Sequence, residues 1–441
     1  MFQNLYISHS KRGSEHFYLD ASARYRCIFP CFKEIQATTQ HCIHIDQLDK
    51  IDLKAYQKII FHRPIYSRKL LKTLKYLNSN GIQCIADFDD LLFSPEHALE
   101  NPTYLSGNTS KKASRASFNN YLKALTLFKH VQVSTDRLKE HVERMHPQAE
   151  VSVIYNLVPD FWPKLTKLVP AEQRLENKVI RYFPGTTHHT SNFNNTIDFL
   201  KHYLTENKDV RLEVVGDIDI DSSIFTESQF KQYESILFDE LPELIASSWV
   251  TISPLENNEF NHCKSGLKFW ESGIFGVPVI SNCNLDMGRF KNDGLLLSDE
   301  YKDWSEFLEK LKDDGEYLSS STDAQNVSKD AYMHNCEQDL GSNSILYSTY
   351  LSAHIGPNWL ECLYNPASNM HNTAKLKFNY LNETKPKINN QELSNLKIEA
   401  NILKLKYMNL GSINKLSRKV SKLKRTPILF FKDMLKKRAL S

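Results

Sequence analysis

The stretch from Ser253 to Ser281 places two lysines and a glutamate at a spacing that could bind a nucleotide. A helix over residues 265–275 would bring Lys264, Lys268 and Glu271 within about 60° of one another on one face. The lysines could neutralise a diphosphate beside the free N–H groups at the start of the helix, and the carboxylate could accept hydrogen bonds from ribose hydroxyls. A solvent-exposed helix face with a Lys–Glu pair at i, i+3 is the plainer alternative.

A second candidate is the acidic segment Asp87-Phe88-Asp89-Asp90, which follows the apolar run Ile82–Ala86. Two aspartates in a D-x-D pattern could hold a divalent cation through hard oxygen ligands. They could also orient an acceptor hydroxyl, or Asp89 or Asp90 could cap the N-terminus of a helix that begins at Leu91. The residues alone leave these three interpretations open.

Two further segments carry polar side chains that suit anionic ligands. Arg26, after Tyr25, could bind a phosphate or a carboxylated sugar through its planar fork, although a surface helix start would also explain the pair. Gly185-Thr186-Thr187-His188 forms a turn in which His188 could contact phosphates or be an ordinary loop residue.

Alternating apolar runs and helical patterns predict the elements that position these residues. We expect strands at 4–8, 58–62, 82–86, 131–134, 151–155, 179–183, 211–216, 249–253 and 277–281, and helices at 68–77, 136–145, 193–204, 240–247 and 267–275. Such alternation predicts an α/β fold with parallel sheets that are covered by helices on both faces. Ligands of open α/β sheets lie beyond the carboxyl ends of the strands, which selects 87–90, 185–188, Gly216 and 254–264.

Composition excludes several other classes. The 441 residues are 41% hydrophobic and 24% charged, values of an ordinary globular protein rather than a disordered or fibrous one. The eight cysteines are scattered without a second metal-spaced pair, which favours reduced, cytosolic thiols. The sequence shows no signal peptide and no apolar run long enough to span a membrane. It also lacks G-x-S-x-G, H-E-x-x-H and Walker motifs, so serine hydrolases, zincins and P-loop NTPases have no support.

The segment from Ser253 to Ser281 resembles the nucleotide-sugar site of GT-B-fold retaining glycosyltransferases, namely glycosyltransferase family four and its bacterial polysaccharide relatives. Many bacterial members read P-L-x-x-x-x-F-N-x-x-K-S-x-L-K-x-x-E followed by G-x-P-V-I, and this chain matches at Pro254, Leu255, Phe260, Asn261, Lys264, Ser265, Leu267, Lys268 and Glu271. The turn at Gly185, the strand end at Val215-Gly216, the D-x-D-D-L-L segment, Tyr25-Arg26 and Asn156 resemble further family features, so that the resemblance covers about residues 1–340.

The resemblance implies two Rossmann-like domains facing a cleft, an acceptor domain over 1–165 and a nucleotide-sugar domain over 175–365, with a helical basic tail over 366–441. It also implies a nucleotide-sugar donor as co-substrate, a glycan or lipid-linked acceptor, no other cofactor and no metal. The implied catalytic residues are Glu271, Lys264, Lys268 and Asp87; the implied donor-binding residues are Gly185, Thr186, His188, Gly216, Pro254, Leu255 and Ser265; and the implied acceptor-binding residues are Tyr25, Arg26, Asp89 and Asp90.

One position departs from the family pattern. The common E-x₇-E motif places a glutamate eight residues before Glu271, where this chain has Cys263. The family role of that first glutamate is to contact the donor sugar, so the substitution leaves the identity of the donor open. A non-catalytic scaffold of the same fold, which binds a nucleotide-sugar or a glycan, is therefore an alternative to a hexosyltransferase-type enzyme, and a metal-dependent GT-A transferase is a third.

The C-terminal segment has a charge unlike that of the rest. Residues 415–441 hold ten lysines and arginines and one aspartate, a formal +9 against +3 for the whole chain. With the apolar run Ile428–Phe431 this composition favours an anionic membrane surface over nucleic acid, since no nucleic-acid module is recognisable. It resembles the endings of bacterial capsule and polysaccharide transferases, which implies a cytoplasmic protein peripheral to the inner face of the cytoplasmic membrane. Apolar residues at 3-4 spacing over 393–423 would also suit a homo-oligomer.

Overall fold

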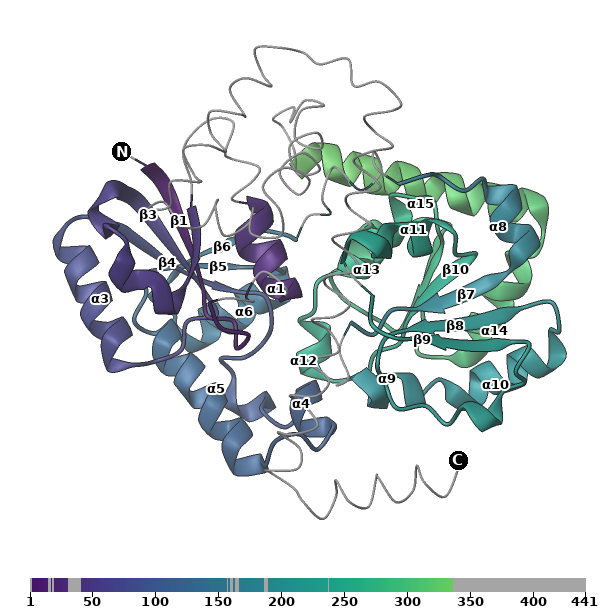
Figure 1. Ribbon diagram of the computed structural model, residues 1–441, viewed down its shortest axis with the longest axis horizontal. Helices are drawn as coiled ribbons and strands as arrows, with labels where there is room; N and C mark the ends of the chain where they lie inside the picture. The colour runs from purple at the N-terminus through teal and green to yellow at the C-terminus, as the bar shows by residue number, and fades with distance from the viewer. Residues whose placement is uncertain are drawn as a thin grey trace, which may run out of the picture. The chain divides into compact units, whose positions relative to one another are not determined.

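Two six-stranded sheets form the framework of the protein (Figure 1). The strands of one lie within residues 2–153, which we call the first half, and those of the other within residues 179–297, which we call the second half. This computed structural model describes residues 2–14, 17, 20–30, 41–156, 158, 162, 166–185, 189–236 and 238–335. Every strand pairing in both sheets is parallel, so the α/β fold expected from the alternation is confirmed. The tail over 366–441 lies outside the described residues.

The first sheet has the order β2-β1-β3-β4-β5-β6. Its strands are β1 (Phe2–Ser8), β2 (His41–His44), β3 (Tyr56–His62), β4 (Gln83–Phe88), β5 (His130–Val133) and β6 (Glu150–Val153). The helices of this half are α1 (Ala21–Ala23), a π-helical turn at Arg24–Ile28, α3 (Arg68–Ser79), a 3₁₀ turn at Pro95–His97, α4 (Pro102–Leu105), α5 (Lys111–Leu125) and α6 (Asp136–Met145).

The second sheet has the order β12-β11-β10-β7-β8-β9. Its strands are β7 (Val179–Tyr182), β8 (Arg211–Val215), β9 (Phe230–Tyr233), β10 (Val250–Ser253), β11 (Val279–Ser281) and β12 (Leu295–Leu297). Its helices are α8 (Ala171–Asn177), α9 (Thr190–Asn194), α10 (Ile197–Glu206), α11 (Leu241–Ala246), α12 (Glu259–His262), α13 (Leu267–Gly273), α14 (Tyr301–Lys310) and α15 (Asp314–Asn335).

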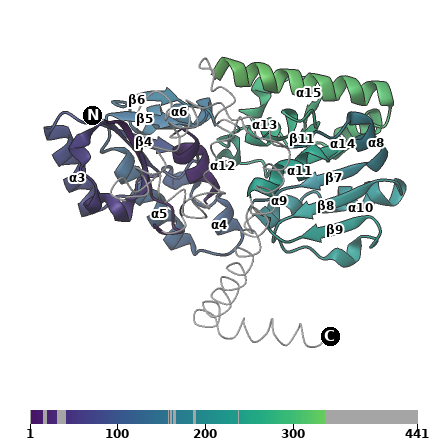
Figure 2. The same cartoon turned by 45° about the horizontal axis from the view of Figure 1, so that its top comes forward.

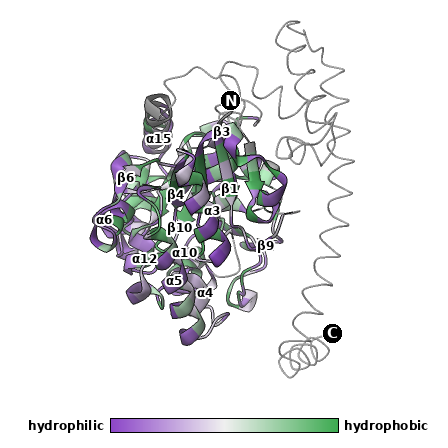
Figure 3. Cartoon of the chain, turned by 90° about the vertical axis from the view of Figure 1, so that its left-hand side faces the viewer, coloured by the Kyte–Doolittle hydropathy of each residue, from purple (hydrophilic) through white to green (hydrophobic). Residues whose placement is uncertain are grey.

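Apolar side chains are buried on both faces of the second sheet. On β11, Val279 belongs to one buried apolar cluster and its neighbour Ile280 to another, because successive strand residues point to opposite faces. The long helix α15 closes one of these clusters beside α8 and α13, where Arg174 donates to Ser321 (Figure 2). Figure 3 shows the matching pattern in the first half, with hydrophobic colour along the strands and hydrophilic colour on surface helices such as α6.

Several expected elements differ in detail. The helix expected over 193–204 is two helices, α9 and α10, with Asn195 and Thr196 between them. The edge strands β2, β9 and β12 were not expected; FKQY in β9, for example, mixes apolar and polar residues without strict alternation. Residues 163–178, rich in proline, lysine and glutamate, were expected to be a polar joint, but they contain helix α8, whose C-cap residue Lys178 lies in the left-handed region (φ 43°).

Candidate functional site

The order of strands in the second sheet marks one edge as a place for a ligand. Strand β7 is the first strand of its sheet along the chain, and it pairs with β8 on one side and β10 on the other. The chain connections therefore reverse direction between β7 and β10, which creates a crevice beyond the carboxyl ends of these strands. The expected donor-binding residues Gly185, Gly216, Pro254 and Leu255 follow these three neighbouring strands.

Two glycines shape this edge of the sheet. Gly185, after β7, has φ +74°, a conformation in which other residues are strained. Gly216, after β8, has φ +153°, and a Cβ on it would lie 2.7 Å from the ring of Pro184. Both positions thus require glycine for backbone reasons. Thr186 and His188, which we also expected here, lie outside the described residues.

The segment after β10 turns back onto the sheet edge. The Leu255 amide donates to Asn282 Oδ1 at 2.9 Å, and the Gly266 amide donates to Asp286 Oδ2 at 2.6 Å. Helix α13 begins only at Leu267, so the helix assumed over 265–275 is wrong at its start. Because Lys264 and Ser265 precede the helix, the shared helical face expected for Lys264 does not form, whereas Lys268 and Glu271 keep their i, i+3 relation.

Glu271 is the most enclosed member of the expected donor site. Its side chain is buried, with the residue 3% exposed, and it accepts hydrogen bonds from Lys268 Nζ at 2.9 Å and from the Tyr25 hydroxyl at 2.6 Å. Tyr25 belongs to the first half of the chain. Burial, and then the charge of Glu271, raise the pKa of Tyr25 well above its usual value, so the phenol remains a donor. The plainer interpretation of an exposed Lys–Glu pair therefore does not describe Glu271.

Lys264 and Ser265 meet the first half of the chain. Lys264 Nζ lies 3.4 Å from Asp90 Oδ1, and both side chains are 21% exposed. The Ser265 hydroxyl accepts a hydrogen bond from Asn156 Nδ2 at 3.2 Å. The structure thus brings the expected donor residues beside one of the expected acceptor residues.

Asp87 and Arg26 bind each other inside the first half. Arg26 Nε lies 3.1 and 3.0 Å from the two Asp87 oxygens, and its Nη1 donates to Asn156 Oδ1 at 3.1 Å. Asp87 is completely buried and Arg26 is 2% exposed. A buried ion pair of this kind fixes its surroundings, because loss of either partner leaves an uncompensated charge.

Asp89 and Asp90 are held mainly by Arg63, a residue that the sequence analysis did not single out. Arg63 Nε lies 2.6 Å from Asp89 and its Nη2 2.5 Å from Asp90. Burial alone would raise the pKa of Asp89, but Arg63 and His62 outweigh burial and hold that pKa well below its usual range. No helix begins at residues 89–92, so the N-cap interpretation is wrong. Arg63 could have been found from its place after the strand expected over 58–62.

The aspartates of the D-x-D segment face cationic side chains rather than one another. Among the described residues, the side chains grouped closely enough to hold a metal are Glu96, His97 and His141 in one set and His141, Glu259 and Cys263 in another, neither of which includes an aspartate. The three aspartates instead have arginine or lysine partners. This arrangement disfavours a metal-dependent site at Asp87–Asp90.

Cys263 occupies a packing position. It is completely buried in the apolar core of the first half, together with Phe260, and its carbonyl accepts from Thr135 Oγ1 at 3.0 Å. Burial, followed by the charge of Glu259, raises the pKa of the thiol. The Cys263 thiol also lies 3.9 Å from Glu259 Oε1, so a glutamate here would place a second carboxylate beside Glu259, which favours the neutral cysteine.

No helix within the described residues is long and apolar enough to span a membrane.

Comparisons with known proteins rest on structure alone. No protein-family model and no curated protein matches the sequence. A glycosyltransferase from Rickettsia africae superposes with a TM-score of 0.51 at 12% identity, covering 82% of this chain and 99% of that one. Sucrose-phosphate synthase from Thermosynechococcus elongatus gives 0.50 at 12% identity, covering 80% and 99%. HepE from Anabaena, in complex with UDP and glucose, gives 0.49 at 15% identity, covering 75% and 96%.

The glycosyltransferase and the synthase match over nearly their whole length, through both sheets of this chain. At this level of identity the likeness concerns the fold. The two parallel sheets, their order and these matches together give this chain the GT-B fold of glycosyltransferases.

Proposed function

We propose that this protein transfers a sugar from a nucleotide-sugar donor to a glycan or lipid-linked acceptor. The observation that carries the proposal is the position of residues 254–271. They begin at the carboxyl end of β10, beside β7, where the strand order of the second sheet reverses. A crevice at such a point is where open α/β sheets bind their ligands.

The donor would occupy this crevice through its ribose and its diphosphate. Glu271 accepts the ribose hydroxyls in exchange for one of its two present donors, Tyr25 or Lys268. Lys268 and Lys264 then stabilise the diphosphate as negative charge develops on the leaving group, where catalysis gains most. Lys264 is able to turn from Asp90 to the donor, because a contact of 3.4 Å between partly exposed groups costs little to break.

The acceptor would approach from the first half of the chain. Asp90 is the carboxylate that reaches Lys264, so it is the aspartate placed to orient an acceptor hydroxyl. Asp87 and Arg26 act as positioning residues in this proposal, since both are buried and bound to each other. Retention at the anomeric centre is part of the proposal on the strength of the family resemblance.

The cellular setting follows from the same resemblance. The protein works in bacterial capsule or surface-polysaccharide synthesis, held at the inner face of the cytoplasmic membrane by the basic tail. The tail and the 393–423 stripe, which would support a homo-oligomer, lie outside the described residues, so this part of the proposal rests on composition.

Cys263 favours a second candidate, a non-catalytic nucleotide-sugar- or glycan-binding scaffold. Its thiol is buried, between the apolar core of the first half and Glu259, at the position where the family carries a sugar-contacting glutamate. Such a scaffold would bind the donor without consuming it, so nucleotide release separates the two candidates.

A panel of nucleotide-sugars tests the proposal on the full-length protein. The correct donor raises the melting temperature, because a ligand that binds only the folded state stabilises it. The same donor releases nucleoside diphosphate when an acceptor is present. The same two measurements are made on Lys268→Ala. Lys302→Ala, at an exposed lysine paired with Glu306 on α14, is the control variant for it. If no donor shifts the melting temperature, the donor site is wrong; a shift without release supports the scaffold.

A further inference from the structure

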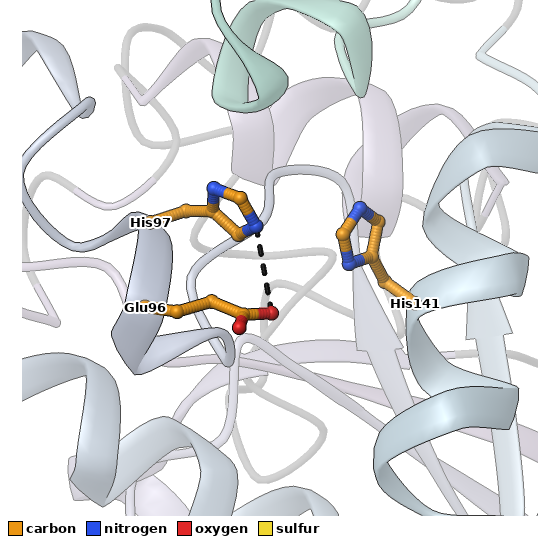
Figure 4. A group of neighbouring side chains, drawn as sticks. All are labelled: Glu96, His97 and His141. Atoms are coloured by element: carbon orange, nitrogen blue, oxygen red, sulfur yellow. Dashed lines mark ion pairs between the residues drawn. The ribbon is translucent and has the colours of Figure 1, made fainter.

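Two histidines and a glutamate converge in the first half of the chain, apart from the proposed donor site. Glu96 and His97 come from the 3₁₀ turn Pro95–His97, and His141 comes from helix α6. One donor atom of each side chain lies within 4.8 Å of the others (Figure 4). The two imidazole rings stand nearly perpendicular, at 86°, with 5.5 Å between their centres.

Each imidazole already uses one nitrogen on a carboxylate outside this group. His97 Nδ1 lies 2.9 Å from Glu100, and His141 Nε2 lies 2.7 Å from Glu259. A carboxylate only accepts, so these two nitrogens carry protons, which leaves His97 Nε2 and His141 Nδ1 as the nitrogens that a metal could use. His97 Nε2 faces Glu96 at 3.5 Å, and His141 Nδ1 faces the same carboxylate in Figure 4. A histidine held by a carboxylate in this way is the usual form of a metal-binding histidine.

A cation already occupies part of the convergence point. Arg144 Nη2 lies 3.0 Å from His141 Nδ1 and is also hydrogen-bonded to Glu96. The guanidinium therefore bridges two of the three electron-pair donors. The Arg144 side chain is 55% exposed, so it can swing into solvent at small cost.

We propose that Glu96, His97 and His141 form a binding site for a divalent transition-metal ion, Zn²⁺ in the first place, from which Arg144 is displaced. Two imidazole nitrogens and one carboxylate oxygen suit zinc, with a fourth position left to water. Bond lengths of ~2.0–2.2 Å place the donor atoms of a tetrahedral site ~3.4 Å apart. Glu96 and His97 already lie 3.5 Å apart, and His141 lies within 4.8 Å of both, so it has to move in by at most about 1.4 Å.

The overlapping group of His141, Glu259 and Cys263 is the weaker site. Arg137 pairs with both oxygens of Glu259, at 2.6 and 3.1 Å, and neutralises that carboxylate. The Cys263 thiol is completely buried beside Glu259, 3.9 Å from Oε1, and has no access to solvent. His141 Nε2 cannot bind a metal while its proton is donated to Glu259, so the ion belongs on the Nδ1 side.

The bound ion would join the 3₁₀ turn to helix α6. Through the His141–Glu259 contact it would also steady helix α12, which leads into Lys264. Its role is structural, because none of its ligands belongs to the proposed donor site. Metal binding at this site therefore does not depend on the proposed transfer reaction.

Competition for Zn²⁺ against a chromophoric chelator tests the site, on full-length protein stripped with EDTA and then freed of it. We expect one tight site whose filling raises the melting temperature by a few degrees. Substitution by Co²⁺ should give the visible absorption of a tetrahedral site. His97→Ala and Glu96→Gln should each weaken binding more than ~100-fold, and Glu100→Gln, which removes an outer partner, about tenfold.

Two further variants distinguish a metal site from an ion-pair network. Arg144→Ala should tighten Zn²⁺ binding, by about tenfold, because it removes a competing cation. His202→Ala, at an exposed histidine paired with Glu206, is the matched control and should change nothing. Wild-type binding no tighter than that of His97→Ala, or no response to Arg144→Ala, would mean that the cluster is an ion-pair network with a protonated His97. Loss of binding in His202→Ala would place the ion elsewhere.

Discussion

The acidic cluster of the first half and the lysine-bearing segment of the second half differ in how their charges are satisfied. Asp87 and Asp89 are buried and held by arginines at fixed positions. Lys264 and Lys268 are partly exposed and each contacts a single carboxylate. Buried, fully paired charges position a structure, whereas exposed charges with one weak partner are available to a ligand. We therefore assign scaffolding mainly to the first region and ligand binding to the second.

Breaking the buried pair of the first region should have the largest effect. Asp87→Asn removes the counter-charge of Arg26 in a site closed to water, and we expect a loss of about 3–5 kcal/mol in the free energy of unfolding. Asp49→Asn, in the exposed pair with Lys69, is the matched control and should cost less than about 1 kcal/mol. Chemical denaturation measures both, and equal losses would remove the distinction between buried and exposed charges.

The lysines of the second region should affect transfer rather than folding. Lys264→Ala and Lys268→Ala should each slow the reaction by ~10²–10³ through lost stabilisation of the leaving diphosphate. Melting temperatures should stay close to that of wild type. If either variant unfolds instead, the lysine is structural and the lysine-bearing segment is not available to a ligand.

Lowering the pH should destabilise the acidic cluster of the first half, because Asp89 becomes protonated. The pKa of Asp89 is lower in the folded protein than in the unfolded chain, so its ionised form contributes stability above pH ~4. That contribution is lost progressively as the pH falls from ~4 through the lower pKa of the folded state. Asp89→Asn should therefore be less stable than wild type at pH 7 and show a flatter stability curve between pH 5 and 3. Parallel curves for the two proteins would contradict the assignment.

The hydrogen bond from Tyr25 to Glu271 joins the two regions. Tyr25→Phe leaves the buried carboxylate with Lys268 as its partner, and we expect a loss of about 1.5 kcal/mol in stability. Tyr66→Phe, at an exposed tyrosine, should be neutral. Equal melting temperatures for Tyr25→Phe and wild type would show that the contact is not maintained in solution.

The smallest effect is expected from metal removal. Transfer should survive EDTA, because the aspartates of the D-x-D segment are already paired with arginine or lysine. Assays well below the melting temperature keep any structural role of the Glu96–His97–His141 site out of the measurement. Complete loss of turnover that Mn²⁺ restores would show that transfer depends on a metal ion.

Local patterns were sufficient for much of the fold. Helix α6 begins and ends at the expected residues 136 and 145, and the strands with long apolar runs, such as β3, were found within two residues. The edge strands β2, β9 and β12 were not found; the segment FKQY of β9, for example, has only two apolar residues and no strict alternation.

The partners of the site residues could not be predicted in the same way. Tyr25 and Glu271 are 246 positions apart, and Arg26 and Asp87 are 61 apart. Such contacts depend on how the elements pack, which periodicity does not encode. The sequence therefore indicated which residues carry charge near strand ends, but not that Arg63 or Arg26 would neutralise the aspartates.

We propose above all that the segment after β10 binds a nucleoside diphosphate. Calorimetric titration with nucleoside diphosphates and the matching monophosphates, on wild type, Lys268→Ala and the control Lys302→Ala, measures this binding. We expect one nucleoside diphosphate to bind at least ~10-fold more tightly than its monophosphate, with this preference lost in Lys268→Ala and kept in Lys302→Ala. Equal binding of the two nucleotides by wild type, or an unchanged preference in Lys268→Ala, would contradict the account.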